Sequence, residues 1–137
     1  MAVGIKVGSI TDEIGTSDFL HAFFSTVSYN LEQGWGSRFP ALLNHLYQGS
    51  LEAELAPAAI QELKLIKEEL AAFAPGKVVW DVEDLSKQPP WGANISPEIT
   101  SLANYFVTST GRDLISIFIE ALDEAAMHKK AAAIVQC

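Results

Sequence analysis

Three carboxylates follow a short apolar stretch near the middle of the chain: Asp81, Glu83 and Asp84. The stretch before them alternates in polarity, which predicts a strand over residues 78–83. Asp81 and Glu83 would then lie on one face of that strand, about 7 Å apart. Carboxylates at this spacing can hold a divalent metal ion or act as a general acid and base. One hypothesis is therefore a small metal-dependent hydrolase that uses these three side chains.

The same pattern is equally typical of the solvent-facing side of a strand. No histidine, asparagine or further acid is placed to complete a metal shell, and no serine lies in a nucleophile-elbow motif. His21 flanks an apolar helical stripe without a nucleophile beside it, so we interpret it as a boundary residue rather than a catalytic base. These observations favour a binding protein over an enzyme, with no metal and no cofactor.

A stiff loop with a large aromatic side chain follows the carboxylates. Pro89 and Pro90 remove two backbone donors and restrict φ, and Trp91 comes next. Stiff loops that expose an aromatic side chain suit recognition of a partner. Two hypotheses stay open for Trp91: it packs beneath its own loop, or it is an exposed anchor. Trp80, in the apolar stretch, is expected in the core.

A third tryptophan, Trp35, lies between two glycines in the segment Gly34–Phe39. Because such glycines allow unusual backbone angles, we interpret the segment first as a structural corner. Arg38 in this corner can pair with a carboxylate. The candidate partner-binding residues are Asp81, Glu83, Asp84, Trp91, Trp35 and Arg38.

Hydrophobic periodicity along the chain predicts an α+β fold in a single domain, residues 1–137. Strands are expected over residues 2–10, 78–83 and 105–108. Helices are expected over residues 17–33, 40–48, 56–74 and 96–104, and from about residue 112 with a cap at Thr110. This order gives a small sheet of about three strands packed with four to five helices. The alanine-rich tail after about residue 128 is expected to fray.

Composition narrows the classes of partner. The chain has 137 residues, 49% of them hydrophobic, and a formal net charge of −8. This acidity disfavours direct binding to nucleic acid or to an anionic membrane. The only cysteine is Cys137, and neither a signal peptide nor a membrane-length apolar run is evident. We therefore expect a cytoplasmic protein, and the sequence leaves its oligomeric state open.

Four segments of the chain carry a resemblance to a known family: GIKVGSITDEIG, GWGSRFP, VVWDVEDLSKQPPWGANIS and NYFVTSTGRDL. Together they resemble the immunity proteins of bacterial polymorphic toxin systems, and in particular immunity protein family seventy. The likeness runs from about Val3 to Leu122 and is most specific in WDVEDLSKQPPWG. The tail after Met127 lies outside it.

The resemblance implies a small cytoplasmic protein, not an enzyme, that binds a cognate toxin domain and blocks its activity. Many toxin domains of these systems are nucleases with basic surfaces, and an acidic partner would associate with them rapidly. In that case Asp81, Glu83 and Asp84 would supply negative potential, and Trp91 would be a desolvated anchor. The mechanism would be stoichiometric occlusion. An acidic regulatory adaptor that binds some other protein is a further alternative.

Overall fold

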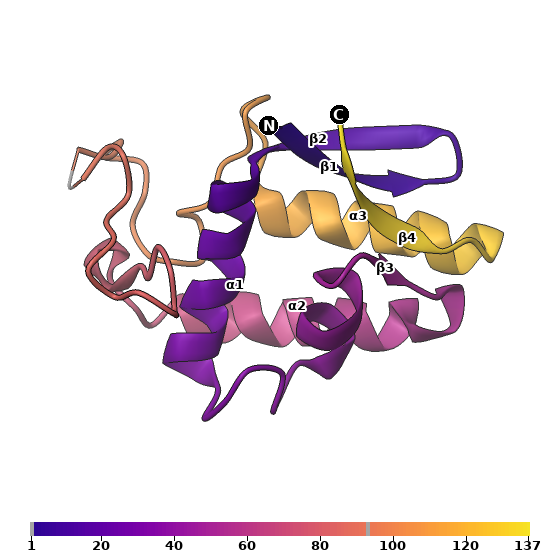
Figure 1. Ribbon diagram of the computed structural model, residues 1–137, viewed down its shortest axis with the longest axis horizontal. Helices are drawn as coiled ribbons and strands as arrows, with labels where there is room; N and C mark the ends of the chain where they lie inside the picture. Colours follow the sequence, from indigo (N-terminus) through magenta and orange to yellow (C-terminus); the bar gives the residue numbers. More distant parts are fainter. Residues whose placement is uncertain (1, 93) are drawn as a thin grey trace.

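The computed structural model describes residues 2–92 and 94–137 (Figure 1). In these residues four antiparallel strands form one sheet in the order β2-β1-β4-β3. The strands are β1 (Ala2–Val7), β2 (Ile10–Thr16), β3 (Ser50–Leu51) and β4 (Ala132–Gln136). The α-helices are α1 (Ser17–Leu31), α2 (Ala56–Leu70) and α3 (Leu114–His128). The shorter helices are the π-helix η1 (Ala41–Leu46) and the 3-10 helices η2 (Ala53–Leu55) and η3 (Pro75–Lys77). The fold is α+β, as predicted.

The sheet lies over α3, and α2 packs against α3 on the side away from the sheet (Figure 1). Helix α1 runs crosswise to both. The core between these layers is rich in phenylalanine, and its largest fully buried side chains include Phe23, Phe24, Phe39, Phe106 and Phe118. Most of the long segment between α2 and α3 lies beside α1 (Figure 1), and its end returns to β2, where the Ser109 N–H donates to the carbonyl oxygen of Ile14 at 3.0 Å. Among the helices of the described residues, none is long and apolar enough to span a membrane.

The first predicted strand, residues 2–10, is in fact a hairpin. Val7 pairs with Ile10, so Gly8 and Ser9 form a two-residue turn, with Gly8 at φ 63°. The polar residues 11–13, just beyond the predicted strand, belong to β2, which is one of the two edge strands of the sheet in the described residues. Gly4 lies at a bulge where the two strands approach closely. The register shifts between Val3 and Gly4, and a Cβ on Gly4 would lie 2.6 Å from the carbonyl oxygen of Asp12.

The helices with clear apolar stripes are confirmed within a few residues. Thr16 caps α1, because its hydroxyl oxygen accepts a hydrogen bond from the Phe19 N–H at 3.1 Å. The predicted short helix at 40–48 is the π-helix η1, and Glu62 of α2 accepts hydrogen bonds from the N–H groups of Ala41 and Leu42 at its start. Helix α3 begins two residues later than predicted, and its cap is Asp113 rather than Thr110.

The other two predicted strands and the helix at 96–104 are wrong. Residues 78–83 pair with no strand, and the Thr26 side chain of α1 bonds the N–H and C=O of Val79 instead. In the 96–104 segment, the Asn104 side chain accepts the N–H groups of Thr100 and Ser101, which leaves turns instead of a helix. Residues 105–108 form only an isolated bridge, between Val107 and Asp113, in the turn that leads into α3.

The alanine-rich tail, expected to fray, forms β4 at the centre of the sheet. It pairs with β1 along residues 132–136 and with β3 through residues 132 and 133. The chain reverses after α3 at Lys129, which adopts a left-handed conformation with φ 56°. Alanine has little preference for strands, so local sequence does not indicate this element. The two neighbouring strands supply the partners for its backbone.

Candidate functional site

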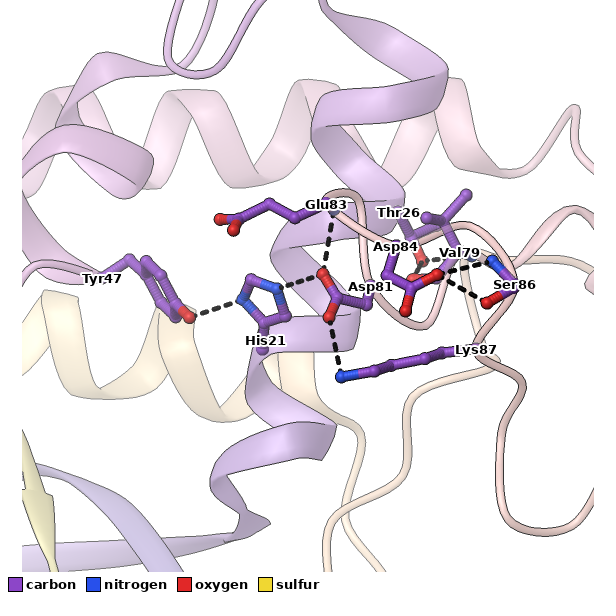
Figure 2. Close-up of polar contacts among 9 residues, drawn as sticks. All are labelled: His21, Thr26, Tyr47, Val79, Asp81, Glu83, Asp84, Ser86 and Lys87. Atoms are coloured by element: carbon purple, nitrogen blue, oxygen red, sulfur yellow. Dashed lines mark hydrogen bonds and ion pairs between the residues drawn. The ribbon is translucent and has the colours of Figure 1, made fainter.

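The segment from residue 77 to residue 88 is named here the docked segment, and its first part, residues 77–81, lies antiparallel along α1. Three side chains of α1 hold it, and Figure 2 draws two of them, Thr26 and His21. Asn30 donates a hydrogen bond to the carbonyl oxygen of Lys77 at 3.1 Å. The buried Thr26 hydroxyl donates to the carbonyl oxygen of Val79 at 3.1 Å and accepts from its N–H at 3.0 Å. The third contact is between His21 and Asp81. These contacts replace the sheet pairing that the predicted strand would have had.

His21 links the docked segment to the end of η1. Its Nε2 lies 3.1 Å from Asp81 Oδ1, and its Nδ1 lies 2.6 Å from the Tyr47 hydroxyl oxygen (Figure 2). A carboxylate only accepts hydrogen bonds, so Nε2 carries the proton, and in the neutral ring Nδ1 accepts from the Tyr47 hydroxyl. The Trp35 ring stacks on the imidazole, with centroids 6.4 Å apart and planes at 25°. Four separate parts of the sequence therefore meet at His21.

Asp81 is the centre of this network. It accepts a hydrogen bond from the Glu83 N–H at 2.9 Å, and its second oxygen lies 3.4 Å from Lys87 Nζ. The Glu83 N–H, then His21 and then Lys87 hold the pKa of Asp81 below its usual value. Burial, together with the nearby carboxylates of Glu83 and Asp81, raises the pKa of Tyr47. Asp81 is therefore ionised and Tyr47 protonated at neutral pH.

Glu83 and Asp84 face solvent in a tight turn after Asp81, so Asp81 and Glu83 do not share a strand face as predicted. The Asp84 carboxylate accepts hydrogen bonds from the Ser86 hydroxyl at 2.6 Å and from the Ser86 N–H at 3.2 Å, which lower its pKa. Leu85, the next residue, is 56% exposed. The turn Glu83–Leu85, named here the acidic turn, thus presents two carboxylates and an apolar side chain.

Asp81, Glu83 and Asp84 do not form the metal site that the hydrolase hypothesis requires. In residues 2–92 and 94–137, no group of three or more histidine, cysteine, aspartate or glutamate side chains is arranged to hold a metal ion. Asp81 and Asp84 instead accept hydrogen bonds from the backbone of their own turns.

Trp91 combines features of both hypotheses made for it. Its Nε1–H donates a hydrogen bond to the Tyr105 hydroxyl at 2.7 Å, and its ring meets Trp80 edge to face at 5.4 Å. The side chain is nevertheless 38% exposed. Trp80 itself is partly buried at the border of the core rather than inside it. Two tryptophans thus join the docked segment to the loop that follows it.

The model of the Immunity protein 70 family matches residues 5–134. The chain belongs to this family. The match covers nearly the whole chain and includes most of β4, so it extends into the tail that the sequence resemblance left out. Comparison with curated proteins gives no match, and comparison with solved structures gives none. Membership supports an immunity function.

In this immunity protein, Trp35 and Arg38 have structural contacts in the corner after α1. Trp35 is partly buried, and its Nε1–H donates to the carbonyl oxygen of Leu43 at 3.2 Å. Arg38 pairs with a carboxylate, as predicted: two of its nitrogens lie 2.8 and 2.6 Å from the carboxylate oxygens of Glu69. Glu32 accepts the N–H groups of the corner backbone, including that of Arg38. Trp35 reaches the neighbourhood of Asp81 through His21, whereas Arg38 is joined to α2.

Sequence reasoning missed the roles of His21, Thr26 and Tyr47 in holding the docked segment. One signal was available: His21 lies at the border of the apolar stripe of α1, where a polar side chain can meet a neighbouring segment. Thr26 lies inside that stripe and is fully buried, and a buried hydroxyl requires a partner. Neither signal identifies the partner, since Val79 and Asp81 are more than fifty residues away.

Proposed function

We propose that this immunity protein binds a cognate toxin domain in a one-to-one complex and blocks it by covering its active site or the path of its substrate. The protein acts in the cytoplasm, without turnover and without a cofactor. The observation that carries the proposal is the family match over residues 5–134. The acidic turn is the contact surface that we favour.

Charge supports this choice of surface. The chain has a formal net charge of −8, and Glu83 and Asp84 are exposed. Hydrogen bonds lower the pKa of Asp81 and of Asp84, so both keep their negative charge when the pH falls moderately. A toxin with a basic surface, such as a nuclease, would be attracted to this region from a distance.

Rigidity also supports it. The acidic turn begins two residues after Asp81, which is tied to α1 through His21. A loop held in one conformation loses less conformational freedom on binding than a mobile loop does. Leu85 adds exposed apolar area between the charged positions and Lys87. Together these features suit a preformed contact with another protein.

The test is copurification with the product of the gene immediately upstream, followed by titration calorimetry at low and high salt. We expect tight one-to-one binding that weakens with salt, and protection of cells that express the upstream protein. Tight binding that is indifferent to salt would keep the function but move the contact from the acidic turn towards Trp91. Absence of both binding and protection would overturn the proposal.

A further inference from the structure

An apolar groove of about 310 Å³ opens beside Trp91. Its apolar walls come from α1, from the loop after the docked segment and from the turn before α3, and are formed by Phe19, Trp91, Ile95, Ile99 and Val107. Val107 is 44% exposed and Trp91 38% exposed, so the groove is open to solvent. An exposed apolar surface with polar residues around it is typical of a site that binds a protein or a ligand.

Trp91 is a wall of this groove and not a side chain free to insert into a partner. Its Nε1–H is bonded to the Tyr105 hydroxyl at 2.7 Å, and Trp80 meets it edge to face at 5.4 Å. Rotating the indole outwards would break the hydrogen bond and separate the two rings. The inserted side chain must therefore come from the partner.

Three acidic residues lie close to groove residues, two of them as neighbours in the chain and one through a hydrogen bond. Asp18 precedes the groove residue Phe19, Glu98 precedes Ile99, and the Glu13 carboxylate accepts a hydrogen bond from the Ser109 hydroxyl near Val107. None of the residues that line the groove is a lysine or an arginine. A partner that fills it will gain most if positive charges flank its apolar side chain.

The groove is also connected to Asp81 through the tryptophan pair. A small pocket beside His21 is lined by Asp18, Trp80 and Asp81, and Trp80 contacts the groove wall Trp91. The nearby cation in this pocket, Lys87, is paired with Asp81. The apolar groove and the carboxylates of Asp18 and Asp81 therefore lie close to each other beside α1.

We propose that the groove receives a large apolar side chain of the toxin that is flanked by lysine or arginine. This inference rests on the proposed function and names the chemistry of the partner at that interface. The groove supplies buried apolar area at the centre, and the carboxylates around it select the basic flank. This is the usual division between the core and the rim of a protein interface.

The test compares Val107→Gln with the matched control Leu65→Gln. Val107 is 44% exposed in the groove and Leu65 is 40% exposed on the outer face of α2, so both substitutions replace a similarly exposed aliphatic side chain. The probe is the purified product of the upstream gene, titrated by calorimetry. We expect Val107→Gln to weaken binding about tenfold or more and Leu65→Gln to leave it unchanged. Melting temperatures of both variants should stay near that of the wild type.

Hydrogen exchange of the wild-type protein keeps the inference testable should Val107→Gln lower stability. The upstream protein should slow exchange in the amides of residues 91–107. The inference about the groove would be overturned if the wild type binds but the two variants bind with equal affinity, or if binding does not protect this segment from exchange. Either result would leave the proposed function intact. Absence of wild-type binding would overturn both.

Discussion

Asp81 lies 3.1 Å from His21, a residue 60 positions earlier in the chain. This pair connects the docked segment to α1 two residues before the acidic turn begins. The imidazole in turn contacts Tyr47 at the end of η1 and stacks on Trp35. The Asp81–His21 contact therefore holds the acidic turn in place, whereas Glu83 and Asp84 are exposed to a partner. Substitutions of Asp81 should change stability, and substitutions of Glu83 and Asp84 should change binding.

Asp81→Asn should lower the melting temperature at pH 7, and the difference from the wild type should vanish in acid. The pKa of Asp81 is lowered in the folded protein, so its stabilising contribution is present above the unfolded pKa of about 3.9. That contribution is lost as the pH falls through the folded value. Thermal melts of both proteins between pH 7 and pH 3 measure the difference.

The control for Asp81→Asn is Asp123→Asn on the exposed surface of α3, which should melt like the wild type at every pH. A difference for Asp81→Asn that stays constant down to pH 3 would contradict the ionised role of Asp81.

Thr26→Val should destabilise the protein by about 2 kcal/mol, because it leaves the buried N–H and C=O of Val79 without their partner. The change keeps the shape of the side chain. The neighbouring Ser25 offers a matched control: it is equally buried, and its hydroxyl finds no hydrogen-bond partner among the described residues. Ser25→Ala should therefore cost little or stabilise the protein.

Urea unfolding measures both changes, and hydrogen exchange should show faster opening of residues 77–81 in Thr26→Val. Equal costs for Thr26→Val and Ser25→Ala would mean that the docking contact contributes nothing specific.

Removing the charges of the acidic turn should slow association with the toxin. The double variant Glu83→Gln, Asp84→Asn removes two exposed carboxylates, and the control Glu52→Gln, Glu54→Gln removes two others beside η2. We expect the first pair to lower the association rate with the upstream protein about tenfold at low salt, and the effect to shrink at high salt. Stopped-flow measurements at both salt concentrations test this, and equal effects of the two pairs would favour net charge over the acidic turn.

Arg38→Gln should leave toxin affinity unchanged and lower stability by less than about 1 kcal/mol. Arg38 binds Glu69 through two nitrogens, but both side chains are partly exposed, at 39% and 31%, so solvent screens the pair. Glu69→Gln is the companion variant and should behave in the same way. Urea unfolding and calorimetry measure the two quantities. A tenfold loss of affinity for Arg38→Gln alone would restore Arg38 as a contact residue.

The sequence predicted the elements whose own residues carry the signal. The apolar stripes of α1 and α2, the Thr16 cap of α1 and the proline in the first turn of α2 depend on residues close together in the chain, so local signals are enough. The corner around Trp35 and the pairing of Arg38 with a carboxylate were predicted from glycine and charge. The resemblance also indicated the family to which the chain belongs.

Only the tertiary structure decided the sheet and the site. The tail became β4 because β1 and β3 offer it backbone partners, although its alanines have little preference for strands. Residues 78–83 alternate like a strand, yet Thr26 of a helix satisfies the Val79 backbone, so they never join the sheet. His21 contacts Asp81 because the fold places this segment against α1. Backbone and side-chain hydrogen bonds are made with whatever the fold brings near, and these partners are far away in the sequence.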